Sequence, residues 1–209
     1  MTLPEISYVA SVLGRCPVGC NLLVFGLSYE TIVWRAINHR GHTIFVDQNY
    51  WWVYFLESSF PGIEAYDVYF GGDGGGVDRS QLSDAIRNYT SRVECRPVQD
   101  LLWSECELAI NDMPNHVYDV AWDVILVDGP RLAGENETAA GPAPAATRMS
   151  SIFTAAVMAR SKRGGAGGGT HVLVHDFGRE AVRVCGEEFL CMENLVGVTD
   201  TLAHFVVGK

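Results

Sequence analysis

The sequence predicts an α/β fold with a mainly parallel sheet, helices on both faces and a C-terminal antiparallel strand pair. Three apolar runs, at residues 21–27, 122–128 and 170–176, have the length and composition of buried strands. Helical patterns separate these runs, as in α/β proteins. Residues 195–198 and 202–207 have the pattern of a closing antiparallel pair.

The first half of the chain contains a strand–helix–strand unit. We expect a strand at residues 21–27, a helix at 29–39 and a second strand at 43–47, which implies parallel strands joined by a right-handed crossover. A helix at 49–57 and an edge strand at 64–70 follow. This second helix is rich in Tyr and Trp. We expect it to pack on the sheet, although one aromatic ring could instead cover an adenine or a sugar.

The second half is expected to contain these elements: a helix at 80–89, a strand at 93–98, a helix at 100–110, a strand at 122–128, a helix at 149–160, a strand at 170–176, a helix at 180–190 and the antiparallel pair. Three segments rich in Gly, Ala or Pro are expected to be flexible loops, at 71–76, 132–147 and 164–169. The second is long enough for a mobile lid. Together these elements predict a single domain over residues 1–209.

The composition of the chain argues against several classes of function. A net charge of −10 argues against a general role in binding nucleic acid or anionic membranes, which broad basic surfaces bind. No apolar run is long enough to span a membrane, and the first residues lack the pattern of a signal peptide. A soluble protein is therefore expected.

The six cysteines do not have the spacing of a structural zinc site. We expect mostly buried free thiols, with one disulfide possible in a secretory compartment. The sequence leaves the pairing open.

A cofactor site is expected where the first strand ends. Gly26 closes this strand, and Asp47 follows it by about 20 residues, the distance at which an acidic residue binds ribose hydroxyls in nucleotide-type folds. The turn has only one glycine, so it lacks the pyrophosphate-binding pattern of NAD and FAD sites. S-adenosylmethionine, which has a ribose but no phosphate, fits better. Ser28 and Asp100 are the other cofactor-binding candidates.

Polar side chains also follow the two later buried strands. We expect Asp128, His175 and Asp176 to be catalytic, because carboxylates and imidazoles act as general bases toward hydroxyl groups. Asp128 and Asp176 could instead bind a divalent metal. Alternatively, strand-end aspartates often only cap the following turn.

Three arginines lie near these strand ends in the sequence. Arg131, Arg148 and Arg179 are the candidates for binding a substrate carboxylate, which guanidinium groups bind through two hydrogen bonds. For each of them, a solvated surface position is the alternative.

Several blocks resemble the plant polysaccharide-biosynthesis family that includes glucuronoxylan 4-O-methyltransferases. They are Cys20-Asn-Leu-Leu-Val-Phe-Gly-Leu27, Glu94-Cys-Arg-Pro-Val98, residues 104–130, Arg148-Met149, and residues 152–160, 171–176 and 187–191. The chain departs from the family's usual first loop, Gly-Leu-Gly followed by His-Asp, because Ser28 replaces the second glycine and Tyr29-Glu30 follows.

The resemblance implies a Rossmann-like class I methyltransferase fold. It also implies methyl transfer from S-adenosylmethionine to O4 of glucuronic acid on a cell-wall polysaccharide, of the glucuronoxylan or arabinogalactan type, in the Golgi lumen. The membrane anchor usual in the family is absent from this sequence. Two alternatives stay open: a small-molecule O-methyltransferase, which would not need the arginines, and a non-catalytic polysaccharide-biosynthesis protein.

Overall fold

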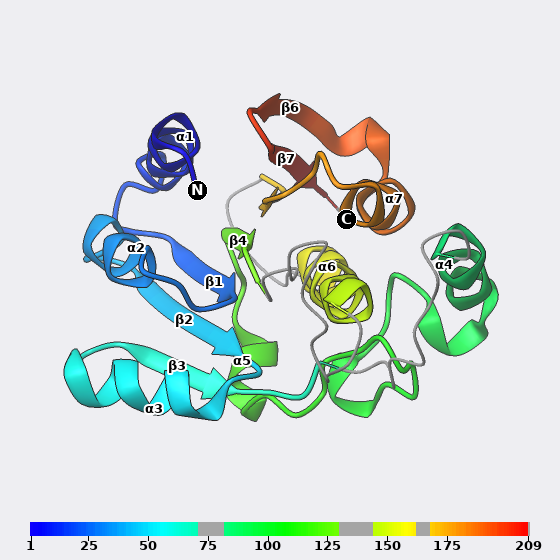
Figure 1. Ribbon diagram of the computed structural model, residues 1–209, viewed down its shortest axis with the longest axis horizontal. Coiled ribbons are helices and arrows are strands. Elements are labelled where there is room, and N and C mark those ends of the chain that lie inside the picture. Colours follow the sequence, from blue (N-terminus) through cyan, green and yellow to red (C-terminus); the bar gives the residue numbers. More distant parts are fainter. Residues whose placement is uncertain (71–81, 130–143, 162–167, 209) are drawn as a thin grey trace.

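The computed structural model describes residues 1–70, 82–129, 144–161 and 168–208, and Figure 1 shows their arrangement. Seven strands form one sheet in the order β3-β2-β1-β4-β5-β7-β6. Strands β1 to β5 are parallel, β7 is antiparallel to β5, and β6 is antiparallel to β7. The predicted mixed α/β fold, with its mostly parallel sheet and C-terminal antiparallel pair, is confirmed.

The strands have these bounds: β1 Asn21–Phe25, β2 His42–Asp47, β3 Glu64–Asp67, β4 Val124–Val127, β5 Thr170–Val174, β6 Leu195–Thr199 and β7 Leu202–Val207. The α-helices have these: α1 Leu3–Leu13, α2 Thr31–Ile37, α3 Tyr50–Ser59, α4 Leu82–Ser91, α5 Asn115–Asp119, α6 Pro144–Ser161 and α7 Glu180–Cys185, which a π-helical turn, Gly186–Leu190, continues. Short 3-10 helices cover Val93–Cys95, Leu101–Trp103 and Met192–Asn194.

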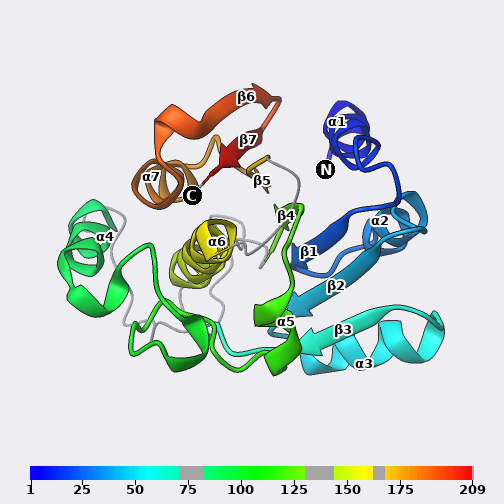
Figure 2. The ribbon, with the colours of Figure 1, turned by 180° about the vertical axis from the view of Figure 1, so that it is seen from behind.

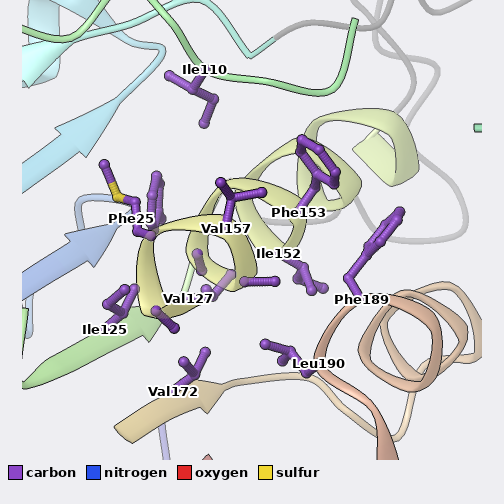
Figure 3. Packing of buried hydrophobic residues seen from close by; sticks show 14 of the residues in the cluster. Phe25, Ile110, Ile125, Val127, Ile152, Phe153, Val157, Val172, Phe189 and Leu190 are labelled. Carbon is purple, nitrogen blue, oxygen red and sulfur yellow. The ribbon is translucent and has the colours of Figure 1, made fainter. Parts of the chain in front are cut away.

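Both faces of the sheet are covered, which explains why its central strands are continuous apolar runs. Figures 1 and 2 show α1, α2 and α3 on one face and α4, α6 and α7 on the other. Alternate strand residues enter the two cores: Leu23 and Ile125 pack on the α6 side, and Leu22 and Leu126 on the α1 side. In Figure 3, Ile152 and Val157 of α6 lie over the strand side chains of the core on the α6 side of the sheet.

Helix α6 is buried around its circumference, because every described side chain from Arg148 to Ala159 is buried. Such a helix needs neighbours on all sides. It contacts β4 and β5 below and α7 beside it, and it is therefore the centre of the larger core. It also begins at Pro144, within the segment expected to be the loop 132–147. The remainder of that loop, all of 71–76 and residues 164–167 lie outside the described residues.

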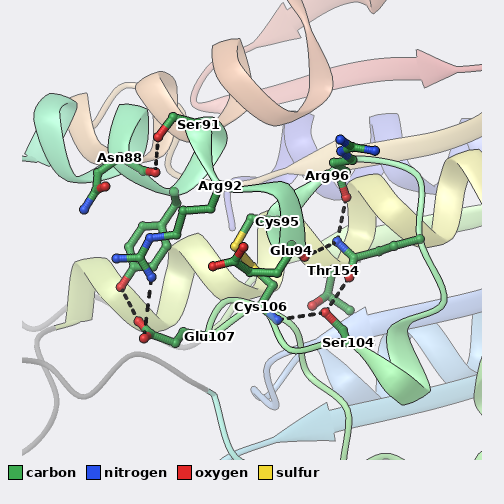
Figure 4. The surroundings of a disulfide bond; sticks show 12 residues. Asn88, Ser91, Arg92, Glu94, Cys95, Arg96, Ser104, Cys106, Glu107 and Thr154 are labelled. Atoms are coloured by element: carbon green, nitrogen blue, oxygen red, sulfur yellow. Dashed lines mark hydrogen bonds and ion pairs between the residues drawn. A yellow bond between two sulfur atoms is a disulfide. The ribbon is translucent and has the colours of Figure 1, made fainter.

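Residues 93–110 differ from the prediction. The expected strand at 93–98 and helix at 100–110 are absent, and two 3-10 turns replace them. The two valines that bound the expected strand, Val93 and Val98, are exposed, whereas Cys95 between them is buried. A disulfide between Cys95 and Cys106, shown in Figure 4, holds this irregular segment over the core.

The prediction that most of the cysteines are free thiols was also wrong. Two disulfides form, Cys16–Cys20 and Cys95–Cys106, whereas Cys185 and Cys191 are free. Both bridges join cysteines that are close in the sequence, with separations of 4 and 11 residues, and each cross-links a segment that has no strand structure.

Helix α3 packs on the sheet as predicted, but of its aromatic residues only the partly buried Trp52 packs against the core. Val53 and Leu56 are its buried side chains. The rings of Tyr50, Trp51 and Tyr54 are more than half exposed, at 53%, 76% and 57%. The structure thus gives no aromatic core at this helix.

Candidate active site

The structure brings four predicted residues to one edge of the sheet. Gly26, Asp47, Asp128 and His175 lie at the carboxyl ends of β1, β2, β4 and β5. Backbone hydrogen bonds continue the sheet through them: the amide of Gly26 donates to Val46, that of Asp128 to Phe25 and that of His175 to Val127, over 2.8, 2.9 and 3.0 Å. Chain order reverses between β1 and β4, and ligands of open α/β sheets bind outside the strand ends at such a point.

The backbone of Gly129 occupies the space beside Gly26. Gly26 has a φ of +102°, and a Cβ at this position would lie 2.4 Å from the Cα of Gly129. Close packing of the loops after β1 and β4 therefore accounts for this glycine. We expected Gly26 to leave room for a cofactor, but the room next to its Cα is already filled.

Asp47 joins the loop after β1 to the end of β2. Its Oδ2 accepts a hydrogen bond from the amide of Leu27 at 2.7 Å, and its Oδ1 accepts one from the amide of Asn49 at 2.8 Å. Burial raises the pKa of the Asp47 carboxyl, against the effect of these hydrogen bonds. Each carboxylate oxygen has a second lone pair, so Asp47 can still accept a hydrogen bond from a ribose hydroxyl.

The other two cofactor candidates have local partners. Ser28 is buried, its amide donates to Oγ1 of Thr31, and its hydroxyl accepts from the amide of Glu30 at the start of α2. Asp100 is exposed and caps the 3-10 helix by accepting from the amide of Leu102. Because the strand expected before Asp100 is absent, this residue does not lie at a strand end.

His175 lies between two carboxylates. Its Nδ1 is 3.0 Å from Oδ1 of Asp128, and its Nε2 is 3.3 Å from Oε2 of Glu5. Burial alone would lower the pKa of His175, but the hydrogen bond with Asp128 and the charges of Asp128, Asp176 and Glu5 outweigh it, so the pKa is raised. This environment favours the imidazolium form, with an N–H directed at each carboxylate.

Arg148 is a buried structural cation. Its side chain is 1% exposed, and it donates to the carbonyls of Val127 and Gly129, each at 3.3 Å, and to Oδ2 of Asp176 at 3.2 Å. Its Nε is buried without a partner among the described residues. We expected Arg148 to bind substrate, but the structure directs its guanidinium to the strand ends and to Asp176 instead.

Arg179 better fits the role of a substrate-binding arginine. Its Nε lies 3.7 Å from Oδ2 of Asp176, and its side chain is 45% exposed. It can therefore meet a ligand while remaining close to the strand ends. Arg131 lies outside the described residues.

The expected metal ligands do not fit a metal site. Asp128 faces the imidazole of His175, and Asp176 faces the guanidinium of Arg148. Across the described ranges, no group of three or more His, Cys, Asp or Glu side chains could hold a metal ion. We therefore derive no step through a metal.

Sequence reasoning missed Glu5, which belongs to a helix that it also missed. Thr2 and Glu5 form a capping box at the start of α1, with the Thr2 hydroxyl 3.3 Å from the Glu5 amide and the Glu5 carboxylate 2.7 Å from the Thr2 amide. The spacing Thr-x-x-Glu is a sequence signal for such a helix start. No sequence signal, however, indicates that Glu5 meets His175.

Similarity to known proteins extends over almost the whole chain. Residues 4–205 match the family model described as IRX15/IRX15L/GXM. The chain belongs to this family. Three relatives from Arabidopsis thaliana are Protein IRX15-LIKE, 50% identical, Protein IRREGULAR XYLEM 15, 48% identical, and Glucuronoxylan 4-O-methyltransferase 3, 34% identical.

These matches cover 100%, 100% and 99% of this chain and 62%, 61% and 63% of the respective relatives. The chain thus spans a little less than two thirds of the length of these family members. No solved structure matches it. Within its described residues, no helix has the length and apolarity needed to cross a membrane.

Proposed function

We propose that this chain is an S-adenosylmethionine-dependent O-methyltransferase with a Rossmann-like methyltransferase domain. Its acceptor is O4 of glucuronic acid on a cell-wall polysaccharide of the glucuronoxylan or arabinogalactan type. The observation that carries the proposal is the Asp128–His175 pair, which lies at the same edge of the sheet as Asp47, the edge at which chain order reverses between β1 and β4. Relatives named as glucuronoxylan and arabinogalactan methyltransferases, at 32–34% identity, support the acceptor class.

The strand ends offer groups suited to S-adenosylmethionine. Asp47 would accept hydrogen bonds from its ribose, and the loop from Gly26 to Ser28 would lie along the same ligand. When bound, the cofactor supplies an electrophilic methyl group on sulfur. The protein therefore has mainly to align a hydroxyl with the C–S bond and to accept its proton.

Asp128 is the base in this proposal. The raised pKa of His175 favours the imidazolium form, so in this proposal the ring orients the Asp128 carboxylate and Asp128 removes the proton. As O4 received the methyl group that the cofactor would supply, its proton would pass to Asp128. Arg179 binds the glucuronate carboxylate, which directs O4 toward the reacting carbon.

The two disulfides support the proposed location. Structural disulfides persist in oxidising compartments and are rare in the cytosol. The Golgi lumen, the expected site of this family, lies on the secretory route, and the bridges Cys16–Cys20 and Cys95–Cys106 fit such an environment.

Calorimetry and a transfer assay test the proposal. S-adenosylmethionine should bind the wild type, and Asp47→Ala should weaken this binding. Labelled methyl should pass to glucuronate-bearing oligosaccharides and not to small phenols. Transfer to phenols alone would favour the small-molecule alternative, in which Arg179 has no function.

A second candidate function rests on the relatives themselves. The two relatives near 50% identity have names that state no activity, and the methyltransferase names occur at 34% or less. The alternative is a non-catalytic protein that binds polysaccharide or a biosynthetic partner. Oligosaccharide binding without S-adenosylmethionine binding would favour it.

A further inference from the structure

We propose that Glu5 is a positioning residue of the candidate active site, whose carboxylate holds the His175 imidazole in the orientation that presents its other nitrogen to Asp128. The inference rests on the proposed function, because it assigns Glu5 a part in the same reaction. It also makes α1 a component of the site, although this helix lies at the other end of the sequence.

The Glu5 carboxylate is itself rigidly held. It is fully buried, and its Oε1 accepts hydrogen bonds from the amide and hydroxyl of Thr201, at 2.9 and 2.7 Å. Its Oε2 accepts from the amide of Thr2 at 2.7 Å. Three donors from two segments thus fix both oxygens, so little conformational entropy remains for Glu5 to lose when it binds a fourth group.

The segment that holds Glu5 also holds the chain next to His175. The carbonyl of Thr201 accepts from the amide of Phe177 at 2.8 Å, two residues beyond His175. In the same turn, Asp200 accepts from the hydroxyl of Thr2 at 2.7 Å. The β6–β7 turn therefore fixes the start of α1 and the end of β5 relative to each other.

The imidazole occupies the line between Glu5 and Asp128, with one nitrogen for each carboxylate. Other charged groups also face this region. Asp176 has its Oδ1 3.9 Å from Nδ1 of His175, and Arg148 and Arg179 are both paired with Asp176. The N-terminal ammonium, which is paired with Glu30, interacts with the charges of Asp128 and Glu5. Only Glu5 contacts Nε2 among the ion pairs of the described residues. Without Glu5, the ring would keep its contact with Asp128 but lose the partner that fixes its rotation.

A capping role alone does not account for this arrangement. The capping box uses one hydrogen bond to Oε2, and a capping glutamate functions well when exposed to water. Glu5 instead lies at 0% exposure with an imidazole 3.3 Å from the same oxygen. A buried carboxylate needs charged or hydrogen-bonding partners, and the imidazole of His175 is in contact with this one.

The test is a double-mutant cycle with Glu5→Gln and His175→Gln, measured by kcat and by urea unfolding. Glu5→Gln should lower kcat by about 10- to 100-fold, with the Kd for S-adenosylmethionine unchanged, because a misplaced reacting group slows the chemistry. In the His175→Gln background it should lower kcat less than about twofold, because Glu5 acts through the imidazole. Glu5→Asp, which keeps the charge, should regain part of the lost kcat.

Two controls separate positioning from folding. Val12→Ala removes buried contacts at the end of α1 far from Glu5, so it should lower stability and leave kcat unchanged. Glu64→Gln removes a carboxylate that contacts two histidines, His42 and His116, near the opposite strand ends, and it should not affect kcat.

Unchanged kcat in Glu5→Gln, or strictly multiplicative losses of kcat in the double variant, would overturn the proposal. Should the wild type transfer no methyl group, the proposed function fails. Urea unfolding of the wild type, the two single variants and the double variant then still tests whether Glu5 and His175 interact. Additive losses of stability would show that they do not.

Discussion

Gly26 and Gly129 face each other across the ends of β1 and β4, so closely that a Cβ on Gly26 would lie 2.4 Å from the Cα of Gly129. The contact fixes the loop after β1 relative to the loop that follows Asp128. The proposed cofactor side and the proposed acceptor side of the candidate site thus share a backbone contact that leaves no room for a side chain.

Substitution of Gly26 should therefore damage both halves. Gly26→Ala should lower the free energy of unfolding by about 2 kcal/mol or more, because it adds a clash to a φ of +102° that side chains rarely adopt. Urea unfolding and calorimetry with S-adenosylmethionine measure the two effects. Gly197→Ala is the matched control, because a Cβ there meets nothing within 4 Å.

Replacement of the proposed base should separate chemistry from binding. Asp128→Asn should reduce kcat by about 10²- to 10⁴-fold, the usual contribution of general base catalysis. Its affinity for S-adenosylmethionine should remain near that of the wild type. Asp67→Asn, an exposed carboxylate at the end of β3, should leave both values unchanged. Turnover that survives in Asp128→Asn would assign the base to another group.

His204 should make the protein less stable in mild acid. It is fully buried in β7 between Tyr8 and His171, and burial, followed by the charges of His171 and Arg15, lowers its pKa to about 4. Between about pH 6.5 and pH 4 the unfolded chain binds a proton at this position that the folded chain does not. The free energy of unfolding should therefore fall as the pH falls through this range.

The variant His204→Gln should show a flatter decline over the same interval, measured by urea unfolding at several pH values. The exposed His39, changed to Gln, is the control and should keep the wild-type slope. An equal slope in all three proteins would contradict the assignment to His204.

The Cys95–Cys106 bridge should stabilise the fold more than the Cys16–Cys20 bridge does. The cysteines are 11 and 4 residues apart, and a longer closed loop restricts the unfolded chain more. The double variant Cys95→Ser/Cys106→Ser should lose about 2–3 kcal/mol of unfolding free energy. Thermal unfolding of both double variants should give the larger loss for this pair, and the reverse order would contradict the entropic explanation.

The central strands could be predicted because a strand that is buried on both faces has a continuous apolar sequence. Apolar runs such as those before Gly26 and Asp128 cannot be exposed, and their polar ends marked one edge of the sheet correctly. The segment 93–110 was mispredicted because a disulfide and tight turns hold it, and neither has a periodic signal.

The candidate site was only partly predictable for a related reason. Asp128 and His175 follow strands, so topology alone brings them together. Glu5 reaches them from a helix far away in the sequence, through a turn between β6 and β7, and only tertiary packing shows this. Arg148 was expected to bind substrate, because its sequence context does not reveal that α6 buries it.

The most direct test of the account is methyl transfer from labelled S-adenosylmethionine to a glucuronate-bearing xylo-oligosaccharide, with the product analysed for the position of the label. The proposed function predicts label on O4 of the glucuronate with the wild type and with Asp67→Asn, and almost none with Asp128→Asn. A folded wild-type protein that binds S-adenosylmethionine but labels no glucuronate oligosaccharide would contradict it.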